Sequence, residues 1–117
     1  MATRAATITP IETFKDHAHV VRWTGLLNGD DGSPIEMPGS SDRSIQFTGT
    51  FGTGGTIALE GSNDGVNYVV LTDPQGNNIS KTAASIEAVT ELTRYIRPRV
   101  TAGDGTTNLV ATLLVKR

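Results

Sequence analysis

The sequence contains no cysteine, which excludes disulfide bonds, thiolate metal sites and a cysteine nucleophile. Aromatic residues make up 5% of the chain and include one tryptophan, so few aromatic side chains are available to stack against a sugar. A formal net charge of −2 provides no long-range field that would gather nucleic acid. No run of ~20 apolar residues is present. We therefore expect neither nucleic acid nor a membrane as a partner.

Glycine and threonine are abundant where helical proteins would carry alanine, leucine, glutamate and lysine. The chain has 13 glycines in 117 residues, with 37% hydrophobic and 19% charged residues, a mixture that favours strands and turns. A chain of this length fits one domain with one core. We predict an all-β fold, a small antiparallel β-sandwich of jelly-roll type that occupies residues 19–117.

Hydrophobic residues alternate with polar ones in several segments, as in strands that bury one face. In the first of these segments, Val21, Trp23 and Leu27 share a parity and are expected to point inward. The segment 79–92 fits either a short helix or irregular strands, and we favour the extended form. The predicted strands are 19–27, 44–51, 56–61, 66–72, 94–100 and 108–116.

Two stretches show no sustained period and are predicted to lie outside the core. Residues 1–18 are rich in threonine and alanine and contain Pro10, so we expect an extended N-terminal arm that either stays free or docks on a neighbour. Residues 28–42 are polar and glycine-rich and too long for a tight hairpin, so we expect an exposed loop.

Three short stretches combine Asp or Asn with glycine and suggest either turns or calcium ligands. The stretch 62-SNDG-65 lacks the later bidentate glutamate of an EF-hand loop, so a hairpin turn is the favoured interpretation. The same interpretation is favoured for 30-DDG-32 and 103-GDG-105. A calcium ion shared between such loops stays an alternative, because the fold decides which oxygens meet.

No catalytic pattern is present in the sequence. His17 and His19, with Asp16, form at best a partial metal site, and no third ligand at a recognisable spacing accompanies the two imidazoles. The Gly-x-Ser-x-Gly elbow of serine hydrolases does not occur, and 52-GTGG-55 lacks the lysine and helix of a phosphate loop. We expect a protein that is not an enzyme and that uses no metal and no cofactor.

The most distinctive basic feature is a strand with alternating arginines. Arg97 and Arg99 fall on one face of the predicted strand 94–100. Arginine is enriched at protein interfaces because its planar guanidinium pairs with carboxylates through two parallel hydrogen bonds. The sequence equally allows pairs within the chain, with Glu60 or Glu91, so both roles stay open.

A resemblance to small virion proteins of tailed bacteriophages rests on an ordered set of motifs across residues 44–115. The set comprises 45-IQFTGTFGTGGTIALEGSNDGVNYVVLTDPQG-76, then 94-RYIRPRVTAGDGTT-107, then a closing strand. The SNDG hairpin followed by RYIRP is also similar to the corresponding strands of discoidin-type jelly rolls. This second likeness supports the sandwich fold more than a function.

The resemblance implies a decoration (cement) protein on the outer capsid shell, made in the bacterial host cytoplasm and located on the virion. It implies the major capsid protein as partner and a homo-oligomer, a trimer or dimer. Two alternatives remain, a tail tube, tip or fibre component and a carbohydrate-binding β-sandwich module. The candidate partner-binding residues are Pro10, Ile11, Phe14, Trp23, Arg97 and Arg99.

Overall fold

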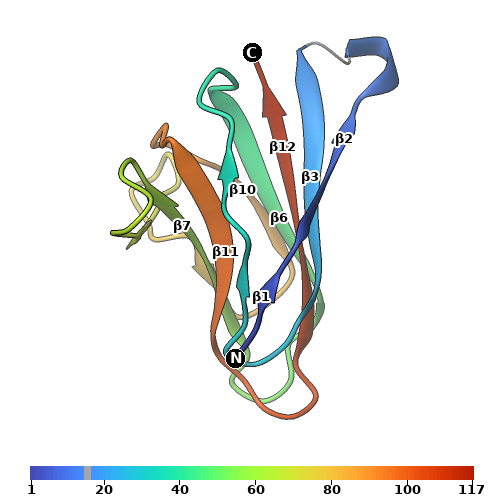
Figure 1. Ribbon diagram of the computed structural model, residues 1–117. Coiled ribbons are helices and arrows are strands. Elements are labelled where there is room, and N and C mark those ends of the chain that lie inside the picture. Colours follow the sequence, from blue (N-terminus) through green and yellow to red (C-terminus); the bar gives the residue numbers. More distant parts are fainter. Residues whose placement is uncertain (15–16) are drawn as a thin grey trace.

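The protein is an all-β sandwich of two sheets (Figure 1). The computed structural model describes residues 1–14 and 17–117. For Phe14 it describes the backbone and not the side chain. One 3-10 helix, η1 (Glu12–Phe14), follows the second strand. Within the described residues, no helix is long and apolar enough to cross a membrane. The predicted fold class, an antiparallel sandwich of jelly-roll type, is confirmed.

The first sheet, sheet A, runs in the order β1-β4-β11-β7-β8, with β5 also paired to β11 and β9 also paired to β7. Its described pairs are antiparallel except that of β1 with β4. Its strands are β1 (Thr3–Arg4), β4 (Asp31–Gly32), β5 (Ile35–Glu36), β7 (Thr56–Ser62), β8 (Val69–Val70), β9 (Ser80–Lys81) and β11 (Tyr95–Ala102).

The second sheet, sheet B, is antiparallel and has the order β10-β6-β12-β3-β2. Its inner face supplies much of the core, because alternate residues of β12 from Leu109 to Val115 are fully buried. The sequence predicts this segment, residues 108–116, as a strand. The strands of sheet B are β2 (Ala6–Pro10), β3 (Ala18–Leu26), β6 (Asp42–Thr50), β10 (Ser85–Ala88) and β12 (Asn108–Lys116).

Trp23 joins the two sheets and is not available to a partner. Its side chain is fully buried, and its indole Nε1 donates a hydrogen bond to the Ser33 carbonyl at 2.9 Å. A Cβ atom at Gly32 would lie 2.6 Å from the indole ring, so the ring occupies space that a side chain on β4 would fill. The expectation that Trp23 is a partner contact is therefore wrong, because burial of this large ring is needed for the core.

The N-terminal segment is extended, as expected, but it belongs to the sandwich. β1 pairs with β4 in sheet A, β2 pairs with β3 in sheet B, and Figure 1 shows them following one another along one course. The arm predicted for residues 1–18 thus needs correction for residues 3–10. The physical reason is that strand pairing uses backbone groups, so a segment without side-chain periodicity still completes a sheet edge.

The predicted exposed loop 28–42 also contributes to sheet A. It supplies β4 and β5, and Asp30, Asp31 and Ile35 are buried. These two-residue strands are too short to produce a detectable alternation of side chains. The expectation of a loop outside the core is wrong for this reason.

A β-bulge changes the phase of β3 near its end. Leu109 of β12 faces Leu26, whereas Ala111 faces Trp23, so β3 contains one extra residue in this interval. Gly25 lies inside the bulge with φ of +65°. As a result Leu26 is fully buried and Leu27 is 42% exposed, the reverse of the predicted inward position of Leu27.

The remaining predictions of elements are confirmed in part. The hairpin around 62-SNDG-65 is present, but its second strand is restricted to β8 instead of the predicted 66–72. The ambiguous segment 79–92 is extended, as favoured, and contains β9 and β10.

Candidate functional site

The SNDG loop is a self-contained turn whose carboxylate is occupied by donors of its own chain. Asp64 accepts hydrogen bonds from the backbone N–H groups of Val66 and Asn67, each at 2.8 Å. It also accepts from Asn67 Nδ2 and from the Ser62 hydroxyl, both at 2.8 Å. These bonds hold the pKa of Asp64 well below its usual range, and the bond from the Asn67 N–H has the largest effect. The turn interpretation agrees with this arrangement.

Of the other two acidic stretches, 103-GDG-105 lies at a turn, whereas the turn predicted for 30-DDG-32 is wrong, because Asp31 and Gly32 form β4. Asp104 accepts from the Thr106 hydroxyl and N–H and from the Thr53 N–H, and the Thr106 hydroxyl is the main cause of its lowered pKa. Asp30 points into the fold, where the N–H groups of Ala2 and Leu27 bond to it. In the part of the chain that the structure describes, no group of three or more His, Asp or Glu residues is arranged to hold a metal ion.

The two arginines of β11 belong to an ion cluster on the outer face of sheet A, which we call the sheet A ion cluster. Arg97 pairs with Glu60 at 3.1 Å and with Asp31 at 3.3 Å. Arg99 pairs with the other oxygen of Glu60 at 3.3 Å. The Arg97 guanidinium also lies 3.9 Å from the centre of the Tyr68 ring.

Of the two roles that the sequence leaves open for the arginines, the structure shows pairing within the chain. The predicted pairing with Glu60 is confirmed for both, whereas Glu91 bonds instead to the hydroxyl and N–H of Thr72. The Arg97 side chain is 21% exposed and has two carboxylate partners. Arg97 is thus engaged within the chain, whereas Arg99 shares Glu60 with it and has a side chain that is 48% exposed.

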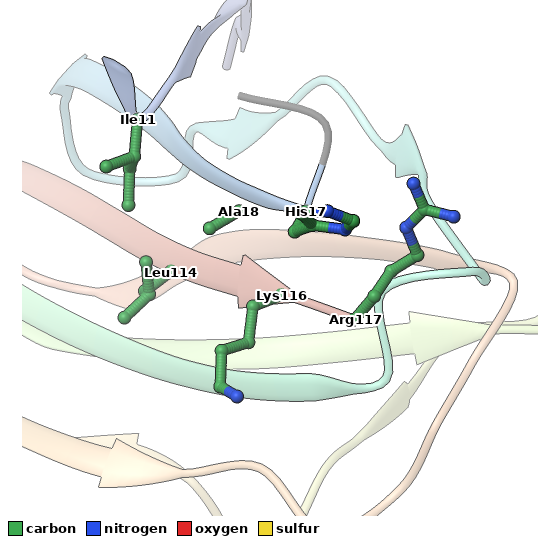
Figure 2. A pocket seen from close by; sticks show the side chains of 6 residues that line it. All are labelled: Ile11, His17, Ala18, Leu114, Lys116 and Arg117. Carbon is green, nitrogen blue, oxygen red and sulfur yellow. The ribbon is translucent and has the colours of Figure 1, made fainter. Parts of the chain in front are cut away.

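A hollow of about 470 Å³ lies at the end of sheet B near the C-terminus (Figure 2). We call it the terminal hollow. Ile11, Ala18 and Leu114 form an apolar surface within it. Figure 2 shows Lys116 and Arg117 projecting away from this surface in different directions, so two basic groups border the apolar surface at its C-terminal end. His17 is the sixth lining residue.

The terminal hollow contains one of the predicted partner contacts and one leucine that the prediction missed. Ile11 is among the predicted contacts, and Pro10 beside it is exposed at the end of β2. Leu114 was missed, although its signal is visible. It is apolar and 39% exposed, yet it stands out of phase with the inward-facing residues of β12.

A second, more polar hollow of about 290 Å³ lies beside the SNDG loop. Asn63, Asn67 and Glu91 are among its lining residues. Their polar groups are largely used within the chain, since Asn63 accepts from the Arg94 N–H and Asn67 donates to Asp64. This hollow therefore offers fewer free hydrogen-bonding groups than its composition indicates.

The predicted site residues do not form one surface. Pro10 and Ile11 lie at one end of sheet B, Trp23 is in the core, and Arg97 and Arg99 are on the outer face of sheet A. The side chain of Phe14 is outside the described residues.

Comparison with solved structures identifies several proteins of similar fold. The SPBc2 prophage-derived protein YomS matches with a TM-score of 0.65 at 10% identity, covering 86% of this chain and 95% of that chain. An RmlC-like cupin protein from Desulfovibrio desulfuricans matches with a TM-score of 0.52 at 9% identity, covering 96% and 82%. At these identities the likeness establishes the fold alone.

A third structure, the CBM32 of AlyQ in complex with 4,5-unsaturated mannuronic acid, has a TM-score of 0.42 at 14% identity. It covers 80% of this chain and 75% of that chain, and a likeness at this level supports no functional conclusion. No protein-family model and no curated protein sequence matches the chain.

Proposed function

We propose that this chain is a non-enzymatic structural protein of a tailed-phage particle that decorates the outer capsid shell by binding assembled major capsid protein. The observation that carries the proposal is the shared fold with a prophage-derived protein along nearly the full length of both chains. The ordered motifs of residues 44–115, which resemble small phage virion proteins, add support from the sequence.

The terminal hollow is the surface that best suits contact with the shell. Its apolar centre at Ile11 and Leu114 lies beside Lys116, so an apolar side chain next to a carboxylate would complement it. Lys116 already pairs with Asp42 at 3.5 Å, but both side chains are more than half exposed and the pair is weak. Contact at this surface leaves the sheet A ion cluster intact.

Decoration stabilises a shell by mass action. A protein that binds the assembled shell more tightly than free subunits shifts the equilibrium towards assembly by its binding free energy. Many copies act together, so each contact can be modest in area, of order 800 Å² per partner. A rigid β-sandwich suits this role because little conformational entropy is lost on docking.

Electron microscopy of phage particles labelled on this protein tests the location. We expect label distributed over the head. Label along the tail and none on the head would overturn the decoration role and support the tail alternative. Binding of the purified protein to glycans, without binding to shells, would support a carbohydrate-binding module instead.

A matched pair of substitutions tests the surface. Leu114→Glu removes apolar contact in the terminal hollow, whereas Leu92→Glu makes the same change at a leucine that is 49% exposed elsewhere. Since burying a leucine is worth about 1.5–3 kcal/mol, we expect Leu114→Glu to weaken binding to shells by roughly tenfold or more. Leu92→Glu should bind as the wild type does. Equal binding by both variants would exclude the terminal hollow as the contact.

A further inference from the structure

Strand β2 is an open edge of sheet B. It pairs with β3 from Ala6 opposite Trp23 to Pro10 opposite His19, and it is the last strand in the order of the sheet. Its side chains from Thr7 to Pro10 are exposed. An edge strand presents unpaired backbone N–H and C=O groups to whatever approaches its free side.

The hydrogen-bonding phase of β2 is fixed by one bond just beyond it. Ile11 donates from its N–H to the Ala18 carbonyl at 3.1 Å, and this pair continues the register of β2 with β3. Hydrogen-bonded and non-hydrogen-bonded pairs alternate along an antiparallel ladder. Thr7 and Thr9 therefore bond towards β3, whereas the backbone groups of Ala6 and Ile8 point to the free side.

Proline at position 10 fits this phase. Its nitrogen falls on the free side of the strand, where no ladder bond to β3 is lost, and its carbonyl stays available as an acceptor. The free side of β2 thus offers donors and acceptors at Ala6 and Ile8 and an acceptor alone at Pro10.

The edge also lacks the charged residues that usually prevent strands from pairing between molecules. The run 5-AATITPI-11 contains no charged side chain. Ile8 is 48% exposed on the face that it shares with Val21, so it presents apolar surface at this edge. A second strand that lies against β2 would meet no charge on it and would cover Ile8.

We propose that β2 pairs antiparallel with β2 of a second copy of this chain, about a twofold axis that passes beside Ile8. In this register Ile8 of each copy donates to and accepts from Ile8 of the other. Ala6 of each copy donates to the Pro10 carbonyl of the other, while the Ala6 carbonyl faces a proline that has no N–H and is left to water at the end of the ladder. Every residue of β2 is paired, and Thr7 faces Thr9 of the second copy in a favourable cross-strand pair.

A second copy is favoured over an unrelated strand because the contact is self-complementary. An isologous contact needs the same patch to serve as both partners, and in this register the N–H groups of Ala6 and Ile8 each meet a carbonyl of the second copy. The pairing joins sheet B of the two copies into one continuous sheet. This inference does not depend on the proposed role in a phage particle.

The mass of the protein in solution, measured by light scattering after size exclusion or by native mass spectrometry, tests the proposal. We expect the mass of two chains for the wild type and of one chain for Ile8→Pro. That variant removes an N–H from the free side only and leaves the ladder with β3 in place, as Pro10 already does. Ile8→Val keeps the N–H and the branched side chain and should remain a dimer.

Several outcomes would overturn the proposal. The first is a wild type that is monomeric at all concentrations, and the second is an assembly larger than a dimer. The third is an Ile8→Pro variant that is folded, as judged by circular dichroism, and still dimeric.

Amide hydrogen exchange followed by NMR gives a second readout that needs no substitution. We expect the Thr7 and Thr9 amides to exchange slowly at all concentrations, because they bond to β3. The Ala6 and Ile8 amides should exchange rapidly in dilute protein and slowly in concentrated protein. Rapid exchange of Ile8 in a sample shown to be dimeric would exclude β2 as the contact, whatever the mass of the Ile8→Pro variant.

Discussion

Asp30 is a buried carboxylate that holds the N-terminus to the rest of the fold. It is 3% exposed and accepts hydrogen bonds from the Ala2 N–H at 2.8 Å, and from the Leu27 N–H and Arg4 Nε at 2.9 Å. Burial alone would raise the pKa of Asp30, but the bonds from Leu27, Ala2 and Arg4 together lower it below its ordinary value of 3.8. The ionised form is therefore the one that the fold stabilises.

A dependence of stability on pH follows from the lowered pKa of Asp30. Because the folded pKa is below the unfolded one, the stabilisation is present above pH ~4 and is lost as the pH falls through the folded pKa. Asp30→Asn places an amide among three donors and should reduce the free energy of unfolding by about 2 kcal/mol at neutral pH. Urea unfolding at pH 7 and pH 3 measures this, and the difference between variant and wild type should shrink at pH 3. A constant difference would show that ionisation of Asp30 is not involved.

Arg43 is the buried cation of the sandwich. It is 3% exposed, and its guanidinium donates to the carbonyls of Ser40, Thr93 and Met37 at 2.8, 3.2 and 2.8 Å. Burial lowers the pKa of Arg43. The planar guanidinium thus ties two connecting segments to the start of β6.

Arg43→Lys is expected to be a destabilising change despite the conserved charge. A single ammonium group cannot reach three carbonyls that are arranged around a planar fork, so at least one buried acceptor loses its partner. We expect a loss of about 2 kcal/mol in the free energy of unfolding, measured by urea titration. The exposed Arg22 provides the control, because Arg22→Lys should change stability by less than about 0.5 kcal/mol. Equal effects at both positions would contradict the role assigned to the three hydrogen bonds of the Arg43 guanidinium.

Contacts of single residues were predictable only where they lie across neighbouring long strands. The pairing of Arg97 with Glu60 follows from two strands that the sequence predicts, and the structure places these residues opposite one another. The bond of Arg4 to Asp30 joins residues far apart in the chain within segments that show no period. No local pattern reports such a contact, because it depends on where two irregular segments meet.

At the scale of elements, the bulge at Gly25 sets which leucine enters the core. Gly25 has φ of +65° and open space around its Cα, whereas Gly39 also has open space but no left-handed backbone. Alanine has room at both positions, so a difference in stability between Gly25→Ala and Gly39→Ala would report backbone strain and not steric crowding.

Gly25→Ala should lower the free energy of unfolding by about 1–2 kcal/mol, because a Cβ atom disfavours the left-handed conformation. Gly39→Ala should have little effect or stabilise slightly by restricting the unfolded chain. Thermal unfolding of the two variants measures the difference. If Gly25→Ala is as stable as Gly39→Ala, the left-handed conformation at Gly25 carries no cost and the bulge is not held by glycine.

Long strands were visible in the sequence, and short or edge strands were not. β6, β11 and β12 bury one face each, so their side chains alternate and the period of two appears. β1, β4 and β5 are two residues long, and β2 buries neither face. Their place in the sheets is determined by backbone hydrogen bonds, which leave no trace in side-chain hydrophobicity.

At the scale of the whole molecule, the N-terminal segment connects both sheets. β1 extends sheet A beside β4, and β2 extends sheet B beside β3, so residues 3–10 span one side of the sandwich. Sandwich corners are commonly made by strands that switch sheets. The segment therefore has a structural role within the chain whatever it contacts outside.

Deletion of residues 2–10 tests that structural role. The deletion removes two strands and leaves the buried Asp30 carboxylate without Arg4 and the Ala2 N–H. The Arg4 side chain is 37% exposed, so loss of its pair with the buried Asp30 is expected to cost about 1–3 kcal/mol, and the loss of two strands adds to this. We expect urea unfolding at a much lower midpoint than for the full chain.

Two point variants separate the contributions within this deletion. Arg4→Ala removes the ion pair but keeps both strands, so it should give part of the loss. Pro10→Ala removes no ladder bond and should be close to the full chain, since the proline nitrogen faces the free side of β2. If the truncated protein unfolds at the same urea concentration as the full chain, residues 2–10 are a dispensable arm. In that case, weaker binding of the truncated protein to shells would report contact with the partner and not damage to the fold.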